Sequence, residues 1–173
     1  MATAGERYNV RTGNIWSYAY RGDLTGVKAA LQVGGRRGRR RDEALWEKEE
    51  EETQLVNLQN TLGWTACHAA AAGGHTKVLR YLISNAQANA TTIPDSGGNY
   101  PIHQAAKNGH LHAVQVLEEL AQADVTQLRL SHTKGNAVRE YVLQAYRKKA
   151  QQEKLQQQQK QKLKQQRNNA SSS

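Results

Sequence analysis

Five histidines lie in two short segments of the chain, and histidine is a common protein ligand for Zn²⁺. His68 and His75 lie in the first segment, and His103, His110 and His112 lie in the second. No carboxylates accompany them in an arrangement that would complete a metal site. His68 and His75 recur as His103 and His110 at a constant interval of 35 residues, which favours a repeated structural role. We therefore predict no metal site.

The single cysteine, Cys67, adjoins His68, but adjacent residues on a helix point in different directions and do not form a nucleophile–base dyad. One cysteine also excludes an internal disulfide framework and a CxxC zinc or redox pair, and it fits a reducing compartment. Gly34, Gly35 and Gly38 lack the strand-then-helix setting and the Lys-Ser/Thr end of a phosphate-binding loop. We predict no catalytic residue, no cofactor and no small-molecule substrate.

Two segments of the chain repeat each other. Gly63-Trp-Thr-Ala-Cys-His68-Ala-Ala-Ala-Ala-Gly-Gly74-His75 aligns with Gly98-Asn-Tyr-Pro-Ile-His103-Gln-Ala-Ala-Lys-Asn-Gly109-His110. Both resemble the ankyrin repeat, whose pattern is Gly-x-Thr-Pro-Leu-His-x-Ala-Ala-x-x-Gly-His followed by a second helix rich in Val and Leu. The resemblance implies an all-α ankyrin-repeat solenoid of helix–turn–helix units joined by short hairpin loops. The alanine pairs fit this architecture because closely packed helices leave room only for small side chains.

The two repeats depart from the family pattern at the start of the first helix. The resemblance implies that Thr caps this helix, that Pro lies in its first turn, and that His ties neighbouring turns together. The first repeat keeps Thr65 but has Ala66 in the Pro position, whereas the second keeps Pro101 but has Tyr100 in the Thr position. We expect the second repeat to lose about 1 kcal/mol of helix capping. Cys67 takes the position of the buried Leu.

Weaker copies of the pattern flank the two full repeats. Trp16 aligns with the histidine position in a segment that continues to Leu31, which resembles an N-terminal capping repeat. Gly135 begins a second weak copy that runs on as one helix, as degenerate final repeats do. We divide the chain into an N-terminal extension (1–13), an ankyrin-repeat domain (14–147) and a basic Gln/Lys-rich tail (148–173). Within the domain we assign a capping repeat (14–33), a charged insertion (34–60), full repeats (61–94 and 95–129) and a C-terminal capping unit (130–147).

The insertion holds the densest positive charge, five arginines within six residues, followed by an acidic stretch from Asp42 to Glu52. The arginines could contact RNA phosphate or serve nuclear import, or the nearby glutamates could neutralise them in a solvated loop, which we favour. Residues 43–58 have a helical pattern with an incomplete apolar face. The arginines that could contact an acidic partner are Arg36, Arg37, Arg39, Arg40 and Arg41.

Residues 147–167 carry +7 of the chain's net charge of +9. Pro and Gly are absent after Gly135, so the last repeat helix can continue into an extended C-terminal helix, with a low-complexity tail as the alternative. Leu155 and Leu163 are too sparse for a coiled-coil seam. As a functional element this segment is a cationic arm for tubulin tails, RNA or lipid headgroups, and otherwise it is a solubilising extension. Its basic residues are Arg147, Lys148, Lys149, Lys154, Lys160, Lys162, Lys164 and Arg167.

The family resemblance also implies where protein partners bind, namely the hairpin tips and the concave surface beside the first helices. Among these positions Trp64 is the strongest candidate, because tryptophan is a frequent anchor in interfaces, although it could instead pack against the insertion near Trp46. Carried over position by position, the candidate contacts are Trp64, Asn99, Tyr20, Arg21, Ala72, Gly73, Lys107 and Asn108.

With 173 residues, the chain has room for one ordinary domain, which excludes most multidomain enzymes. We predict a non-enzymatic protein-interaction adaptor or a structural subunit of a larger intracellular assembly, whose basic arm contacts an acidic surface. The alternative is an RNA- or ribonucleoprotein-associated protein that uses the arginine-rich loop and the tail. No apolar run has the length of a signal peptide or membrane span, and the tail lacks an apolar face for a membrane surface. We expect a cytoplasmic protein, associated with the cytoskeleton or axoneme, with the nucleus as the alternative.

Overall fold

The computed structural model describes residues 14–34 and 55–170, and within these ranges the regular structure is entirely helical. The predicted extension at 1–13, the arginine cluster at 36–41 and most of the predicted helix at 43–58 lie outside the described residues, as does the side chain of Arg167. The elements are α2 (Ile15–Arg21), α3 (Leu24–Gly34), α5 (Ala66–Ala72), α6 (Thr76–Ser84), α7 (Pro101–Asn108), α8 (Leu111–Ala121), the 3₁₀ turns η1 (Val125–Gln127) and η2 (Leu130–His132), and α9 (Asn136–Ala170).

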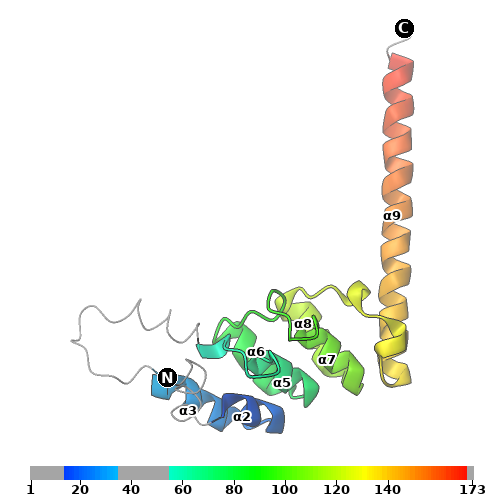
Figure 1. Cartoon of the computed structure of the whole chain (residues 1–173). Coiled ribbons are helices and arrows are strands. Elements are labelled where there is room, and N and C mark those ends of the chain that lie inside the picture. Colours follow the sequence, from blue (N-terminus) through cyan, green and yellow to red (C-terminus); the bar gives the residue numbers. More distant parts are fainter. Residues whose placement is uncertain (1–13, 35–54, 171–173) are drawn as a thin grey trace, which may run out of the picture.

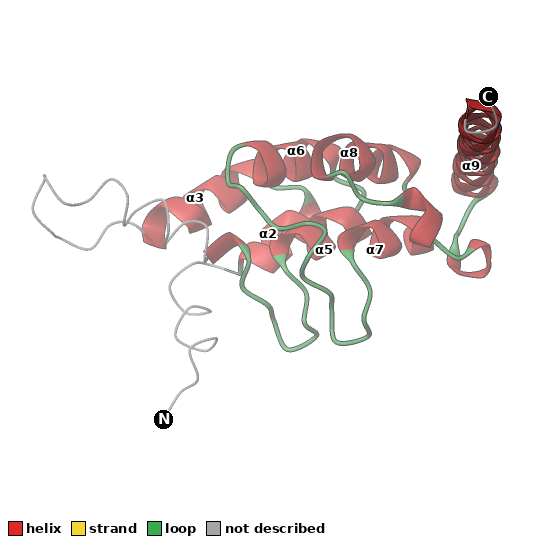
Figure 2. Cartoon of the chain, turned by 90° about the horizontal axis from the view of Figure 1, so that it is seen from above, coloured by secondary structure: helices red, strands yellow, loops and turns green. Residues whose placement is uncertain are grey.

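The first six helices form a stack of three antiparallel pairs, α2–α3, α5–α6 and α7–α8 (Figure 1). The first helices α2, α5 and α7 pack side by side in one layer, and the second helices α3, α6 and α8 form the other (Figure 2). The hairpin loops project from the layer of first helices. This arrangement confirms the solenoid of helix–turn–helix units expected from the sequence.

Alanines make up much of the core between the first helices. Ala70 and Ala105 are fully buried between neighbouring first helices, and every residue of α5 is buried because α2 and α7 cover its two sides. Cys67 belongs to this core, as its place in the repeat predicts, and burial raises the pKa of its thiol to about 12. Such close helix packing tolerates little added volume.

Glycines with left-handed backbone recur at two positions in each unit, in the turn between the paired helices and in the hairpin. Gly74, with φ of 73°, shows why the turn needs glycine, since a Cβ there would lie 2.7 Å from the His110 ring. The turn glycines are Gly22, Gly74 and Gly109, and the hairpin glycines are Gly63, Gly98 and Gly135.

The histidine at the start of each first helix performs two structural tasks. The Nδ1 atom of His68 accepts from the Thr65 backbone N–H at 3.2 Å, so the ring proton lies on Nε2, which donates to the Asn99 carbonyl at 3.0 Å. His103 accepts in the same way from the Tyr100 N–H at 3.2 Å, so the helix lacking a capping Thr keeps this half of the cap. Trp16, in the matching position of the first unit, donates its indole N–H to the Leu58 carbonyl at 3.2 Å.

In the two full repeats, the histidine after the turn glycine joins the repeat to the one before it. His75 Nε2 donates to the Tyr20 carbonyl at 2.8 Å, and His110 Nε2 donates to the Ala72 carbonyl at 3.0 Å. These bonds confirm the expected structural role of the recurring histidines.

Candidate functional site

Trp64 lies in the first hairpin and is half-buried, packed against the core of the stack, whereas the sequence suggested an exposed fingertip. Its backbone N–H donates to Asn60 Oδ1 at 2.9 Å, and its carbonyl accepts from the Asn60 N–H at 3.0 Å. The indole therefore offers a partner only part of its surface. The proposed packing against Trp46 concerns a residue outside the described ranges.

Asn99 lies in the second hairpin, where it holds the loop together. Its backbone N–H donates to Asp95 Oδ1 at 2.8 Å, and its carbonyl accepts from His68. Burial alone would raise the pKa of Asp95, but hydrogen bonds from Asn99, Gln104 and Gly97 outweigh it and leave the pKa below its ordinary value. Asn99 is thus half-buried and engaged in structural hydrogen bonds before any partner binds.

Ala72 and Gly73 lie where two repeats meet. The side chain of Ala72 is buried, and its carbonyl accepts from both Asn108 Nδ2, at 3.1 Å, and His110. A Cβ at Gly73 would lie 2.5 Å from the Tyr20 carbonyl. These two residues lie inside the ridge, by which we mean the row of turns between paired helices, and they present no side chain at its surface.

The exposed part of that ridge consists of the other predicted contacts. Tyr20 is 54% exposed, and Arg21, Lys107 and Asn108 are also exposed. An aromatic ring, an amide and two cations are therefore available on the turns of the first and last helix pairs. These side chains can offer apolar contact and hydrogen-bond donors to a protein partner.

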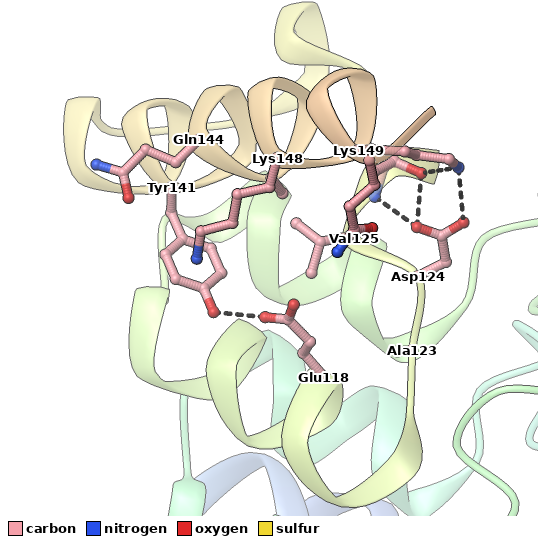
Figure 3. Close-up of a pocket in the computed structure, with 11 residues that line it drawn as sticks. Glu118, Ala123, Asp124, Val125, Tyr141, Gln144, Lys148 and Lys149 are labelled. Atoms are coloured by element: carbon pink, nitrogen blue, oxygen red, sulfur yellow. Dashed lines mark hydrogen bonds and ion pairs between the residues drawn. The ribbon is translucent and has the colours of Figure 1, made fainter. Parts of the chain in front are cut away.

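The first turns of α9 dock on the end of the stack. Val138 and Val142 are fully buried, and the Tyr141 hydroxyl donates to Glu118 on α8 (Figure 3). Burial and this carboxylate together raise the pKa of Tyr141 to about 12. The Tyr146 hydroxyl contacts the carbonyls of Thr126, at 2.8 Å, and Leu128, at 3.1 Å.

A cleft of about 320 Å³ separates α9 from the chain that follows α8, and charged side chains line both walls (Figure 3). Lys149 Nζ lies 2.9 Å from Thr126 Oγ1 and 3.7 Å from Asp124 Oδ2. Hydrogen bonds from Thr126 and, to a lesser degree, the Lys149 charge lower the pKa of Asp124, although burial opposes them. Lys149, a predicted contact for an acidic partner, is therefore already held within the chain.

Beyond Lys149, α9 forms no hydrogen bond or ion pair with the described part of the stack, and it extends away from the stack (Figure 1). Side chains 150–166 are all exposed, including Lys154, Lys160, Lys162 and Lys164. At 100° per residue Lys160 and Lys164 share one face of the helix, whereas Lys154 and Lys162 point to other sides of it. The arm, which we define as residues 150–170, is thus positively charged on several sides and has no single docking face.

The repeat signature and the stack geometry agree with a comparison against known families, because residues 17–128 match the family model described as Ankyrin repeats (3 copies). The chain belongs to the ankyrin-repeat family. This family is in general a non-enzymatic domain that binds other proteins.

Among solved structures, this ankyrin-repeat protein is similar to a chain in the crystal structure of the yeast ribosomal protein Rps3 in complex with its chaperone Yar1. The TM-score is 0.50 and the sequence identity is 20%, over 62% of this chain and 71% of that chain. A likeness at this identity shows a shared fold. No curated protein matches the sequence.

Two features of the ankyrin domain were missed in the sequence analysis. Leu62, directly before a hairpin glycine, is 59% exposed, and the only local signal was its position at a loop tip. The Asp95–Gln104 hydrogen bond of 2.7 Å shapes the second hairpin, but the two residues are distant enough in sequence to hide their pairing. Leu62 and half-buried Trp64 together give the first hairpin an apolar contact surface.

The part of the chain that the structure describes has neither a metal-binding cluster nor a helix able to cross a membrane. Residues 14–34 and 55–170 contain no cluster of three or more His, Cys, Asp or Glu side chains placed to bind a metal ion. None of the helices in these ranges combines the length and the apolar character needed to cross a bilayer.

Proposed function

We propose that this ankyrin-repeat protein is an interaction adaptor or a structural subunit of a larger assembly, and that the arm of α9 contacts an acidic surface of that assembly. The observation that carries the proposal is the contrast along one continuous helix. Residues up to Lys149 pack on the stack, whereas the side chains of residues 150–166 are exposed and form no hydrogen bond or ion pair with the described part of the stack. An isolated helical segment of this length is marginally stable in water, so a partner surface would stabilise it.

The charge on the arm indicates the chemistry of that surface. Lys154, Lys160, Lys162 and Lys164 form none of the ion pairs found within the described residues, which join Arg80 to Glu119 and Lys149 to Asp124. Leu155 and Leu163 are exposed, but two leucines eight residues apart do not make an apolar stripe. Unpaired lysines on several sides of a helix favour a concave or extended acidic surface, such as that of tubulin tails, over a hydrophobic groove.

The stack would supply the second part of the interaction. Its exposed candidates are Tyr20, Arg21, Lys107 and Asn108 on the turns, with Leu62 and the accessible part of Trp64 on the hairpin. The apolar contacts through Tyr20, Leu62 and Trp64 depend on shape and apolar area and respond little to salt, whereas contacts of the arm weaken as ionic strength rises.

Co-purification with arm variants of the full-length chain tests the proposal. In one variant Lys154, Lys160, Lys162 and Lys164 become Gln, and in the matched control the same four residues become Arg, which keeps the charge. We expect partners identified by mass spectrometry to be lost from the Gln variant and kept by the Arg variant. Equal partner sets for the two variants would refute a role for the arm.

RNA is the rival partner for the same charge. An arm that contacts RNA phosphate would lose its associated proteins after nuclease treatment, and its affinity would fall steeply with salt. Retention of the same proteins after RNase digestion supports the protein partner, and their loss supports the ribonucleoprotein alternative.

The proposal also includes a location. We place the protein in the cytoplasm, in association with cytoskeletal or axonemal structures, with the nucleus as the alternative. Imaging of the tagged full-length chain and its Gln variant tests this, since only the former should colocalise with such structures.

A further inference from the structure

A hollow of about 590 Å³ lies at the C-terminal end of the stack. Helix α7 forms one wall, the loop through η2 forms another, and the start of α9 closes a third side. Leu128 and Ala106 contribute apolar surface, and Asn99 and Gln104 contribute amides. The volume falls in the range of sites that hold a small ligand or several side chains of a peptide.

The hollow exists because the final unit departs from the repeat. Helix α5 lies between α2 and α7, but no further first helix packs on α7, since α9 packs mainly against α8 and η1. The hairpin glycine Gly135 is present, yet the chain after it becomes the long helix α9 instead of a helix pair. The outer side of α7 is therefore partly open, with Lys107 exposed and His103 half-buried.

Four permanent cations line this hollow, and no carboxylate does. Lys107, Arg129, Lys134 and Arg139 are all exposed, and none takes part in the ion pairs found among the described residues. Arg139 Nε donates to the Thr133 carbonyl at 3.3 Å, which orients its side chain without neutralising it. Asp95 does not line the hollow, because it is buried and accepts hydrogen bonds from Gln104 and Asn99.

We propose that this hollow binds an acidic peptide segment of a protein partner. Four unpaired cations around a space open to solvent complement several carboxylates, and the binding of these carboxylates relieves the mutual repulsion of the cations. The apolar and amide surface between the cations suits the backbone and the stems of a peptide chain better than isolated phosphate groups. This inference deepens the proposed interaction function, on which it rests, but it concerns a different surface from the arm.

Fluorescence anisotropy with the full-length chain tests the proposal, using a labelled peptide of eight glutamates as the probe. The hollow variant is Lys107→Glu/Lys134→Glu, chosen because both side chains are exposed. The matched control, Lys28→Glu/Lys77→Glu, makes the same change of net charge at exposed positions of α3 and α6, outside both the hollow and the arm. We expect the hollow variant to bind about tenfold more weakly or worse, and this control to change by less than about twofold. Circular dichroism and melting curves should show that both variants remain folded.

Three outcomes would overturn the proposal. Equal weakening in both variants would mean that the peptide responds only to overall charge, and unchanged binding in the hollow variant would place the peptide elsewhere. A labelled oligouridine of equal charge that binds the hollow as tightly as the peptide would replace the acidic peptide by nucleic acid. None of these results bears on the co-purification test of the arm lysines, so the two proposals can fail separately.

Discussion

The repeat stack and the arm of α9 are both helical, but they are held together in different ways. In the stack, buried alanines bring helices into contact, and His75 and His110 hydrogen-bond each repeat to its predecessor. In α9, the contacts of Val138, Tyr141 and neighbouring residues end at Lys149, and exposed side chains follow. The stack can therefore maintain its structure alone, while the arm depends on local helix propensity until a partner covers it.

Because of this contrast, we expect the free energy of unfolding to depend mainly on the buried core of the stack. Substitutions in that core should change folding with little effect on electrostatic binding by the arm, and substitutions in the arm should do the reverse. The predictions that follow test this separation, from the largest expected effect to the smallest.

The largest difference is expected between two alanine-to-leucine substitutions. Ala105 is fully buried between α7 and its neighbours, so Ala105→Leu overfills a close-packed site and should lower the free energy of unfolding by about 1–3 kcal/mol or more. Ala150→Leu, on exposed α9, should change it by less than about 0.5 kcal/mol. Urea denaturation of the two variants measures this, and similar losses would contradict the separation.

Acid should destabilise the stack through two histidines, His68, which is buried, and His103, which is half-buried. Burial lowers the pKa of His68, and of His103, below the ordinary value near 6.5. As the pH falls, these two histidines become protonated in the unfolded chain before they do so in the folded chain. The contribution of their neutral forms to the free energy of unfolding is complete above pH 6.5 and is lost as the pH falls through the folded-state pKa. Melting temperatures between pH 7 and pH 5, above the range of ordinary carboxylates, should show this loss.

Substitution assigns the pH effect to a residue. His68→Gln removes a titrating group but keeps an amide able to hydrogen-bond, so it should reduce the pH dependence, and the remainder should come from His103. The control His112→Gln, at an exposed position, should leave the melting temperature at pH 7 unchanged. An unchanged slope in His68→Gln would show that this histidine does not carry the effect.

The anchor of α9 should contribute a smaller amount. Tyr141→Phe removes the hydroxyl that donates to Glu118 and should cost about 1 kcal/mol, the size of one net hydrogen bond. Tyr20→Phe, at an exposed ring, is the matched control and should cost almost nothing. Chemical denaturation provides the measurement, and a zero effect at Tyr141 would mean that the anchor does not need this bond.

The smallest effect on folding should come from the arm lysines. Replacement of Lys154, Lys160, Lys162 and Lys164 by Gln should leave the melting temperature of the stack unchanged within about 1 °C, because these side chains do not contact it. A clear drop in melting temperature would show that the arm contributes to the stability of the stack.

The sequence predicts the repeats well because their signals are local. Each signal lies within a short segment that recurs along the chain, namely the glycines of the turns and hairpins, the alanine pairs and the histidines. In the first unit, Trp16 forms a hydrogen bond from the position that aligns with His68. The continuous helix α9 is one of the two alternatives that the sequence left open, the other being a low-complexity tail.

The site was harder to predict because its contacts join distant residues. The Tyr141–Glu118 hydrogen bond joins residues that are 23 positions apart, and the hollow is lined by both α7 and the start of α9. No local sequence pattern therefore predicts either feature. Ala72 and Gly73 align with positions that face partners in the family, but the turns around them cover those positions. Trp64 was expected to be an exposed anchor because tryptophan is frequent in interfaces. Its packing against the core reduces the surface that it can offer to a partner.

Hydrogen–deuterium exchange along α9 tests most directly whether a partner stabilises the arm. In the free full-length chain, amides of residues 138–149 should be protected and those of residues 153–166 should exchange fast, because only the former belong to a packed helix. In complex with a co-purified partner, the amides of residues 153–166 should become protected. Equal protection of both segments in the free chain, or an arm that exchanges as fast in the complex as alone, would contradict the account.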